Sequence, residues 1–162
     1  MKTKLMTLSL LFATLSFASA ADKKDKDHDH DHGKVVAGPT GGRILHGVEP
    51  HAEFFVNKEN KVEIRFVDDD NKVVAPADQV VTVTLGDRSA PTKLAFAKDG
   101  NKLVSDKAVP AGNDHPTVVQ IKPTAKGKAV TEKFNLNLEQ CPTCKYKEYA
   151  CTCDHSHDEK KK

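Results

Sequence analysis

The chain has 162 residues, of which 30% are charged and 6% aromatic, and it contains no tryptophan. Its 25 basic and 23 acidic residues give a net charge of +2, and Lys2 and Lys4, near the start of the chain, account for this excess. A chain this close to neutral lacks the charge that marks nucleic-acid binding or electrostatic binding to a membrane surface. Its length accommodates one domain of roughly 100 residues with polar ends.

The first twenty residues have the pattern of a secretory signal peptide. Lys2 and Lys4 give a positive start, residues 5–17 form an apolar stretch, and Ala18-Ser19-Ala20 offers a small-residue cleavage site. The apolar stretch is shorter than the ~20 residues that a membrane-spanning helix needs. No cysteine stands at the cleavage site to carry a lipid. We therefore expect an exported, periplasmic protein without a membrane anchor.

Residues 21–37 are polar and are predicted to be disordered. They include the run Asp27-His28-Asp29-His30-Asp31-His32. Imidazoles and carboxylates together bind Zn²⁺, Cu²⁺ or Ni²⁺, so His28, His30 and His32 are candidate metal-capturing residues. The alternative is a solvated, charge-balanced linker.

Residues 38–138 carry a succession of short apolar runs that predict β-strands. In one of them Val62, Ile64 and Phe66 alternate with charged residues, as in a half-buried strand. The clearest expected strands are Arg43–His46, Ala52–Val56, Val62–Val67, Val80–Leu85, Leu94–Ala97, Val118–Ile121 and Phe134–Leu138.

This pattern favours an all-β fold. Turn residues separate the runs, and Asp99-Gly100 gives the sharpest hairpin signal. No window of a dozen residues shows a helical stripe. Several short strands in about 100 residues predict an antiparallel β-sandwich of the immunoglobulin or fibronectin type, and a small barrel is the alternative.

All four cysteines lie near the C-terminus, within the polar segment 139–162. Cys141 and Cys144 are three residues apart and Cys151 and Cys153 two apart, so the connecting loop can fold back to bring both pairs to one ion. Thiolates bind Zn²⁺ and Cu(I), and four would give a closed tetrahedral site. His155 and His157 follow as auxiliary ligands.

Two alternatives to a metal site use the same cysteines. Structural disulfides fit an exported protein with an even cysteine count, for example Cys141 with Cys153. Bridges across such short loops would stabilise the fold little. Thiol–disulfide catalysis usually places Cys-x-x-Cys at a helix N-terminus, whereas here a predicted strand precedes it. Because the periplasm is oxidising, free thiols would need a metal or a reductant to stay reduced.

His46 and His51 flank a predicted hairpin turn. If the two strands pair, these histidines stand opposite one another and Glu53 shares their face, which makes a possible third metal site. The alternative is a pair of exposed or turn-bound histidines. His115, between Asp114 and Pro116, is expected in a loop.

The segments Gly38-Pro39-Thr40-Gly41-Gly42-Arg43-Ile44-Leu45, His51–Val56 and Val62–Asp68 resemble part of the periplasmic adaptor proteins of heavy-metal efflux systems. In that family a Gly-Pro-x-Gly-Gly-Arg stretch opens a small β-rich domain, often after a His-rich terminus. The resemblance covers about 40 residues, and the chain has no room for the other domains of an adaptor. It implies a free-standing small domain that handles metal ions.

Taken together, these features predict a non-enzymatic, exported metal-binding protein. It would buffer, sequester or deliver zinc or copper, alone or alongside a metal-efflux or metal-acceptor protein. The candidate metal ligands are Cys141, Cys144, Cys151, Cys153, His155, His157, His28, His30 and His32. The alternative function is a structural or interaction module with a disulfide-linked tail.

Overall fold

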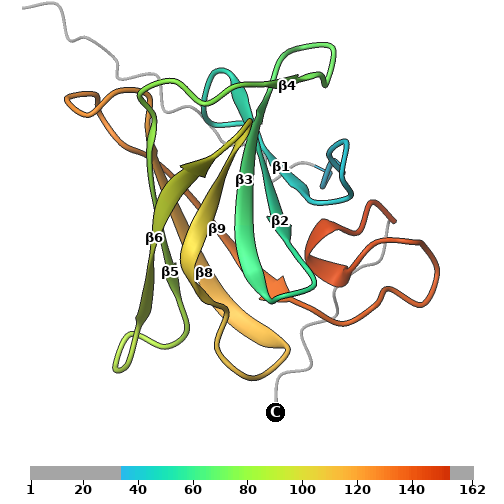
Figure 1. Ribbon diagram of the computed structural model, residues 1–162. Coiled ribbons are helices and arrows are strands. Elements are labelled where there is room, and N and C mark those ends of the chain that lie inside the picture. The colour runs from blue at the N-terminus through green and yellow to red at the C-terminus, as the bar shows by residue number, and fades with distance from the viewer. Residues whose placement is uncertain (1–33, 154–162) are drawn as a thin grey trace, which may run out of the picture. The chain divides into compact units, whose positions relative to one another are not determined.

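The computed structural model describes residues 34–153, which form an antiparallel all-β unit without an α-helix (Figure 1). This confirms the all-β, antiparallel prediction. The elements are β1 (Arg43–Leu45), β2 (His51–Val56), β3 (Lys61–Val67), β4 (Val73–Val74), β5 (Val80–Leu85), β6 (Thr92–Asp99), β7 (Lys102–Ala108), β8 (Asp114–Lys122), β9 (Val130–Asn137) and the 3₁₀ turn η1 (Glu148–Ala150).

The strands follow one continuous hydrogen-bonded path in the order β1-β2-β3-β7-β6-β5-β8-β9, with β4 paired to β3. This sheet curls until it is nearly closed into a barrel, as Figure 1 shows. The finer prediction of an immunoglobulin-like sandwich is not confirmed, because β3 and β6 are linked through β7 rather than lying in two separate sheets. The small barrel, the alternative, describes this path better.

Side chains close the seam between the first strands and the last. Phe54 of β2 meets Phe134 of β9 edge to face, with ring centroids 5.2 Å apart. The guanidinium of Arg43 lies 4.9 Å from the centre of the same Phe134 ring. The Gly47 N–H donates to Glu132 Oε1 at 2.7 Å. The ring pair, the cation–π contact of Arg43 and the hydrogen bond to Glu132 therefore hold the barrel at this seam.

The core is aliphatic and aromatic, as the alternating runs predicted. Its largest fully buried apolar side chains are those of Phe54, Phe66, Leu45, Ile64, Leu85, Leu94 and Leu136. Burying this much apolar surface is what stabilises a domain of this size. The predicted hairpin at Asp99-Gly100 is confirmed, since Asp99 pairs with Lys102 and Gly100 has a φ of +59°.

Strand β7 was not predicted, and a buried polar side chain explains why. Ser105 is 2% exposed and faces the position where the sequence pattern requires an apolar residue. Its hydroxyl accepts a hydrogen bond from the Val62 N–H at 3.0 Å and donates to the Lys107 carbonyl at 2.6 Å. The serine hydroxyl thus supplies hydrogen bonds to backbone groups near the register shift in the β3–β7 pairing, which lies between Lys61 and Glu63.

The structure contradicts the loop position predicted for His115. His115 lies in β8 rather than in a loop, is 8% exposed, and hydrogen-bonds the Gly112 carbonyl through Nε2 at 3.2 Å.

The signal peptide and most of the segment 21–37 lie outside the described residues. Within the described part of that segment, the Val36 carbonyl accepts a hydrogen bond from the Ile44 N–H. Among residues 34–153 no helix is long and apolar enough to cross a membrane.

Candidate metal centre

The four cysteines converge in the segment that follows β9, the last strand of the barrel. Their Sγ atoms all lie within 4.8 Å of one another, and none of them is in a disulfide. Cys141 and Cys151 are buried, while Cys144 and Cys153 are partly exposed. The structure therefore brings together both cysteine pairs that the sequence singled out.

The spacing of the sulfurs matches that of a tetrahedral metal site. With Zn–S bonds of ~2.3 Å, four sulfurs around one Zn²⁺ lie about 3.8 Å apart. The observed separation is 3.4 Å between Cys141 and Cys151 and 3.7 Å between Cys144 and Cys151. A disulfide would instead need an S–S distance of about 2.05 Å. Small side-chain movements would place all four sulfurs on one ion.

The backbone around Cys141 and Cys144 is folded back on itself by local hydrogen bonds. The Cys141 N–H donates to the Tyr146 carbonyl at 3.0 Å. The side-chain amide of Gln140 donates to the carbonyls of Cys144 and Tyr146 at 3.1 and 2.8 Å. These bonds hold the Cys-x-x-Cys turn so that both thiols point toward the second pair.

The thiols of the cluster differ in how readily they lose a proton. Burial raises the pKa of the Cys151 thiol to about 12, against the lowering effect of the Cys153 N–H, which lies 3.4 Å from Cys151 Sγ. The Thr143 hydroxyl donates to Cys153 Sγ at 3.3 Å and lowers the pKa of that thiol. Because burial raises its pKa, Cys151 keeps its proton at neutral pH in the metal-free protein, and a bound divalent ion would displace it.

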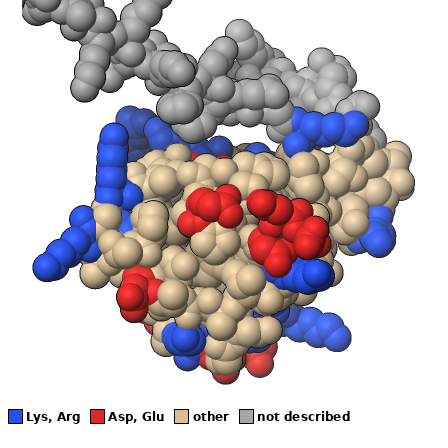
Figure 2. Space-filling model, turned by 90° about the horizontal axis from the view of Figure 1, so that it is seen from above, with Lys and Arg blue, Asp and Glu red and all other residues tan. Residues whose placement is uncertain are grey.

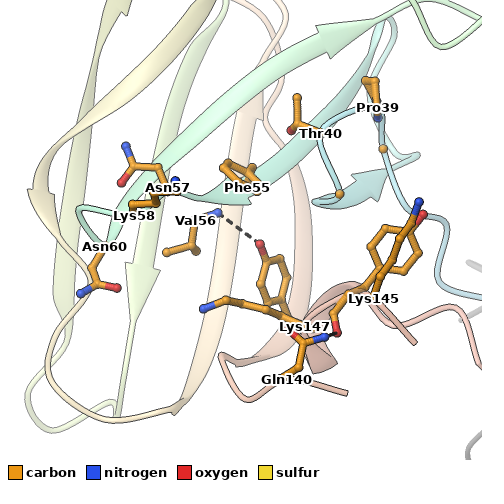
Figure 3. A pocket seen from close by; sticks show the side chains of 14 residues that line it. Pro39, Thr40, Phe55, Val56, Asn57, Lys58, Asn60, Gln140, Lys145 and Lys147 are labelled. Atoms are coloured by element: carbon orange, nitrogen blue, oxygen red, sulfur yellow. Dashed lines mark hydrogen bonds between the residues drawn. The ribbon is translucent and has the colours of Figure 1, made fainter. Parts of the chain in front are cut away.

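Turn η1 anchors the cysteine segment on the barrel. Tyr149 is 3% exposed and Ala150 is fully buried. The Tyr149 hydroxyl accepts a hydrogen bond from the Val56 N–H at 3.1 Å (Figure 3), and its ring stands edge to face with Phe54 at 6.0 Å. Because η1 contacts both β1 and β9, it covers the barrel seam. Cys151 follows directly and is positioned by the core.

A glycine-rich loop, residues 38–42, encloses the carboxylate of Glu53, which is fully buried. Glu53 Oε1 accepts hydrogen bonds from the N–H groups of Thr40 and Gly42, each at 2.9 Å. A Cβ atom at Gly42 would lie only 2.3 Å from the Phe54 carbonyl oxygen. In this chain the Gly-Gly motif therefore has a packing role, because a larger residue would push the loop off β2.

A groove of about 660 Å³ lies between this loop and the cysteine segment (Figure 3). Phe55, Tyr146 and Tyr149 contribute aromatic surface to it. Its lining includes three lysines, Lys58, Lys145 and Lys147, and no acidic residue. The last two belong to the loop that connects the cysteine pairs in the sequence, so the groove is positively charged on the side of the cysteine segment.

A second group of metal-binding side chains lies at another turn. His46 and His51 face each other as the hairpin predicted, with ring centroids 5.0 Å apart, and burial together with His51 lowers the pKa of His46. Glu53 does not join them, because the glycine-rich loop holds its carboxylate. Glu49 and Asp69 lie close to His51 instead.

Of the predicted ligands, His28, His30, His32, His155 and His157 lie outside the described residues. Sequence reasoning missed Tyr149 as an anchor, although an aromatic residue inside a polar cysteine-rich segment is a signal that could have identified it. It also missed Asp69, whose approach to His51 depends on strand register.

Comparisons with family models, with curated proteins and with solved structures found no match to this chain. The resemblance to efflux adaptors therefore remains an expectation from the sequence.

Proposed function

We propose that this is an exported, non-enzymatic metal-binding protein that holds one ion at Cys141, Cys144, Cys151 and Cys153. The observation that carries the proposal is the spacing of the thiol sulfurs, 3.4 and 3.7 Å for two pairs and within 4.8 Å for all. A tetrahedral sulfur set favours zinc, and Cu(I), which is also soft, is the alternative.

Buffering, sequestration or delivery is the proposed role of this ion. Cys144 and Cys153 are partly exposed, so an incoming ligand can reach the ion and replace the thiolates stepwise. His28, His30 and His32 would capture ions, and His155 and His157 would act as auxiliary ligands. These residues lie outside the described part of the chain, and their role is proposed from the sequence.

The lysine-lined groove suits a metal-accepting partner with an acidic face. Lys145 and Lys147 lie between the two cysteine pairs in the sequence, so a partner docked in the groove would contact the segment that carries the ion. Charge complementarity of this kind speeds association and weakens as salt concentration rises. The resemblance to efflux adaptors supports a partner of the metal-export class.

The second candidate function is an interaction module whose cysteines form disulfides. The same groove favours it, because an aromatic and basic hollow can bind a protein without any metal. Counting free thiols in protein purified from the export compartment separates the two candidates. Full oxidation without bound metal supports the interaction module.

Elemental analysis of the natively exported protein tests the primary proposal. The proposal predicts about one zinc or copper ion per chain, lost in Cys151→Ser and retained in Thr152→Ser, a matched change at the next residue. Equal metal content in Cys151→Ser and in the unaltered protein would move the binding site away from the thiols.

A further inference from the structure

A second candidate site lies on the end of the barrel that carries the β1–β2 and β3–β4 turns. One ring nitrogen of His51 and one carboxylate oxygen each from Glu49 and Asp69 lie within 4.8 Å of one another. Figure 2, which looks down on this end, shows acidic side chains gathered in neighbouring groups. We propose that this group, with His46, is a separate binding site for a divalent transition-metal ion.

Strand register brings the ligands together from two turns. His51 begins β2 and pairs with Val67, the last residue of β3. Asp69 lies two residues beyond Val67 and Glu49 two residues before His51, so both carboxylates reach the same place from opposite sides of the pair. Neither carboxylate is committed to the buried network of the glycine-rich loop, which holds Glu53 instead.

The His51 ring is oriented as a ligand would be. Its Nδ1 lies 3.0 Å from the Val48 carbonyl, which can only accept, so Nδ1 carries the proton and Nε2 keeps its lone pair. Metal-bound histidines commonly donate their other N–H to a backbone carbonyl in this way. His46, whose ring centroid is 5.0 Å from that of His51, places a second imidazole beside the first.

The site has room to contract around an ion. Donors around a tetrahedral Zn²⁺ bound by nitrogen and oxygen lie about 3.3 Å apart, closer than the 4.8 Å limit observed. The side chain of Glu49 is 71% exposed, so it can change rotamer without disturbing the core. Glu49 Oε2 now lies 3.7 Å from His51 Nδ1, the nitrogen that faces the Val48 carbonyl, so Glu49 would turn toward Nε2 to join the ion.

The donor set defines which ion would bind. Imidazole and carboxylate donors suit Zn²⁺, Cu²⁺ or Ni²⁺ and disfavour Cu(I), which prefers sulfur. This site and the four thiols would therefore differ in the softness of their ligands. The proposal does not depend on metal binding by the cysteines, because the two groups share no residue.

The test is a zinc titration of the full-length mature chain, from zero to three equivalents, monitored by the imidazole ¹⁵N signals of each histidine. The proposal predicts that the signals of His46 and His51 shift together while that of His115 stays in place. Asp69→Asn should weaken the zinc affinity of this step at least about tenfold, since a ligand is lost. Asp70→Asn, a matched loss of charge at the next residue, should leave it unchanged.

Two outcomes would overturn the proposal. In the first, zinc shifts the signals of His28, His30 and His32 but leaves those of His46 and His51 unmoved. In the second, His51 responds equally in Asp69→Asn and Asp70→Asn, so that the carboxylate of Asp69 is not a ligand. All of these variants change exposed turn residues, so the fold should persist in each.

Discussion

Tyr149→Phe removes a single hydroxyl group from the contact between the cysteine segment and the barrel. The Val56 N–H, buried at the end of β2, would lose its acceptor at 3.1 Å, while the ring would keep its contact with Phe54. A buried donor left without a partner costs about 1–3 kcal/mol. We expect the free energy of unfolding to fall by that amount.

Urea denaturation of the metal-loaded protein at neutral pH measures this change, provided that the slope of the transition is unaltered. Tyr146→Phe is the control, because it removes a hydroxyl from a half-buried tyrosine in the same segment. It should change stability by less than about 0.5 kcal/mol. A loss below about 0.5 kcal/mol in Tyr149→Phe as well would refute the anchoring role of the hydroxyl.

Further predictions concern pH, the glycine-rich loop and metal binding. The pKa of Tyr149 is raised to about 12 by burial, so this shift should contribute about 2–3 kcal/mol to the free energy of unfolding. The contribution should be complete below pH 10 and lost as pH rises toward 12. Tyr149→Phe should therefore flatten this part of a plot of stability against pH. Gly42→Ala should destabilise the protein by more than Gly127→Ala, as measured by thermal unfolding, because a Cβ at Gly42 would meet the Phe54 carbonyl oxygen at 2.3 Å whereas the nearest atom at Gly127 is Thr124 Oγ1 at 3.2 Å. Zinc binding at pH 7 should release protons, because the raised pKa of Cys151 keeps its thiol protonated in the metal-free protein, and zinc affinity should therefore rise with pH. Calorimetry in buffers of different ionisation enthalpy measures this release. The same binding heat in every buffer would refute it.

Much of the fold is predictable because apolar alternation reports which strand face is buried. Val80–Leu85 begins and ends where the sequence placed it. Strand β7 escaped prediction because Ser105 faces inward and is satisfied by backbone groups of other residues. Closure into a barrel rather than a sandwich depends on which strands pair, and local patterns do not encode β3–β7 pairing.

The two candidate sites also differ in how far they could be predicted from the sequence. The cysteines could be grouped from the sequence because all four lie within one short segment, where a single loop brings them together. The group of Glu49, His51 and Asp69 spans two turns and requires the register between β2 and β3. Likewise, the sequence placed Glu53 beside the histidines, and only the packed loop of residues 38–42 shows that its carboxylate is held there instead.

The most direct test of the four-thiolate site is X-ray absorption spectroscopy at the zinc edge on protein isolated from the export compartment. The account predicts a shell of sulfur atoms only, at about 2.3 Å from the metal, as in closed tetrahedral zinc sites. A shell dominated by nitrogen and oxygen, or metal-free protein with Cys141, Cys144, Cys151 and Cys153 all in disulfides, would contradict it.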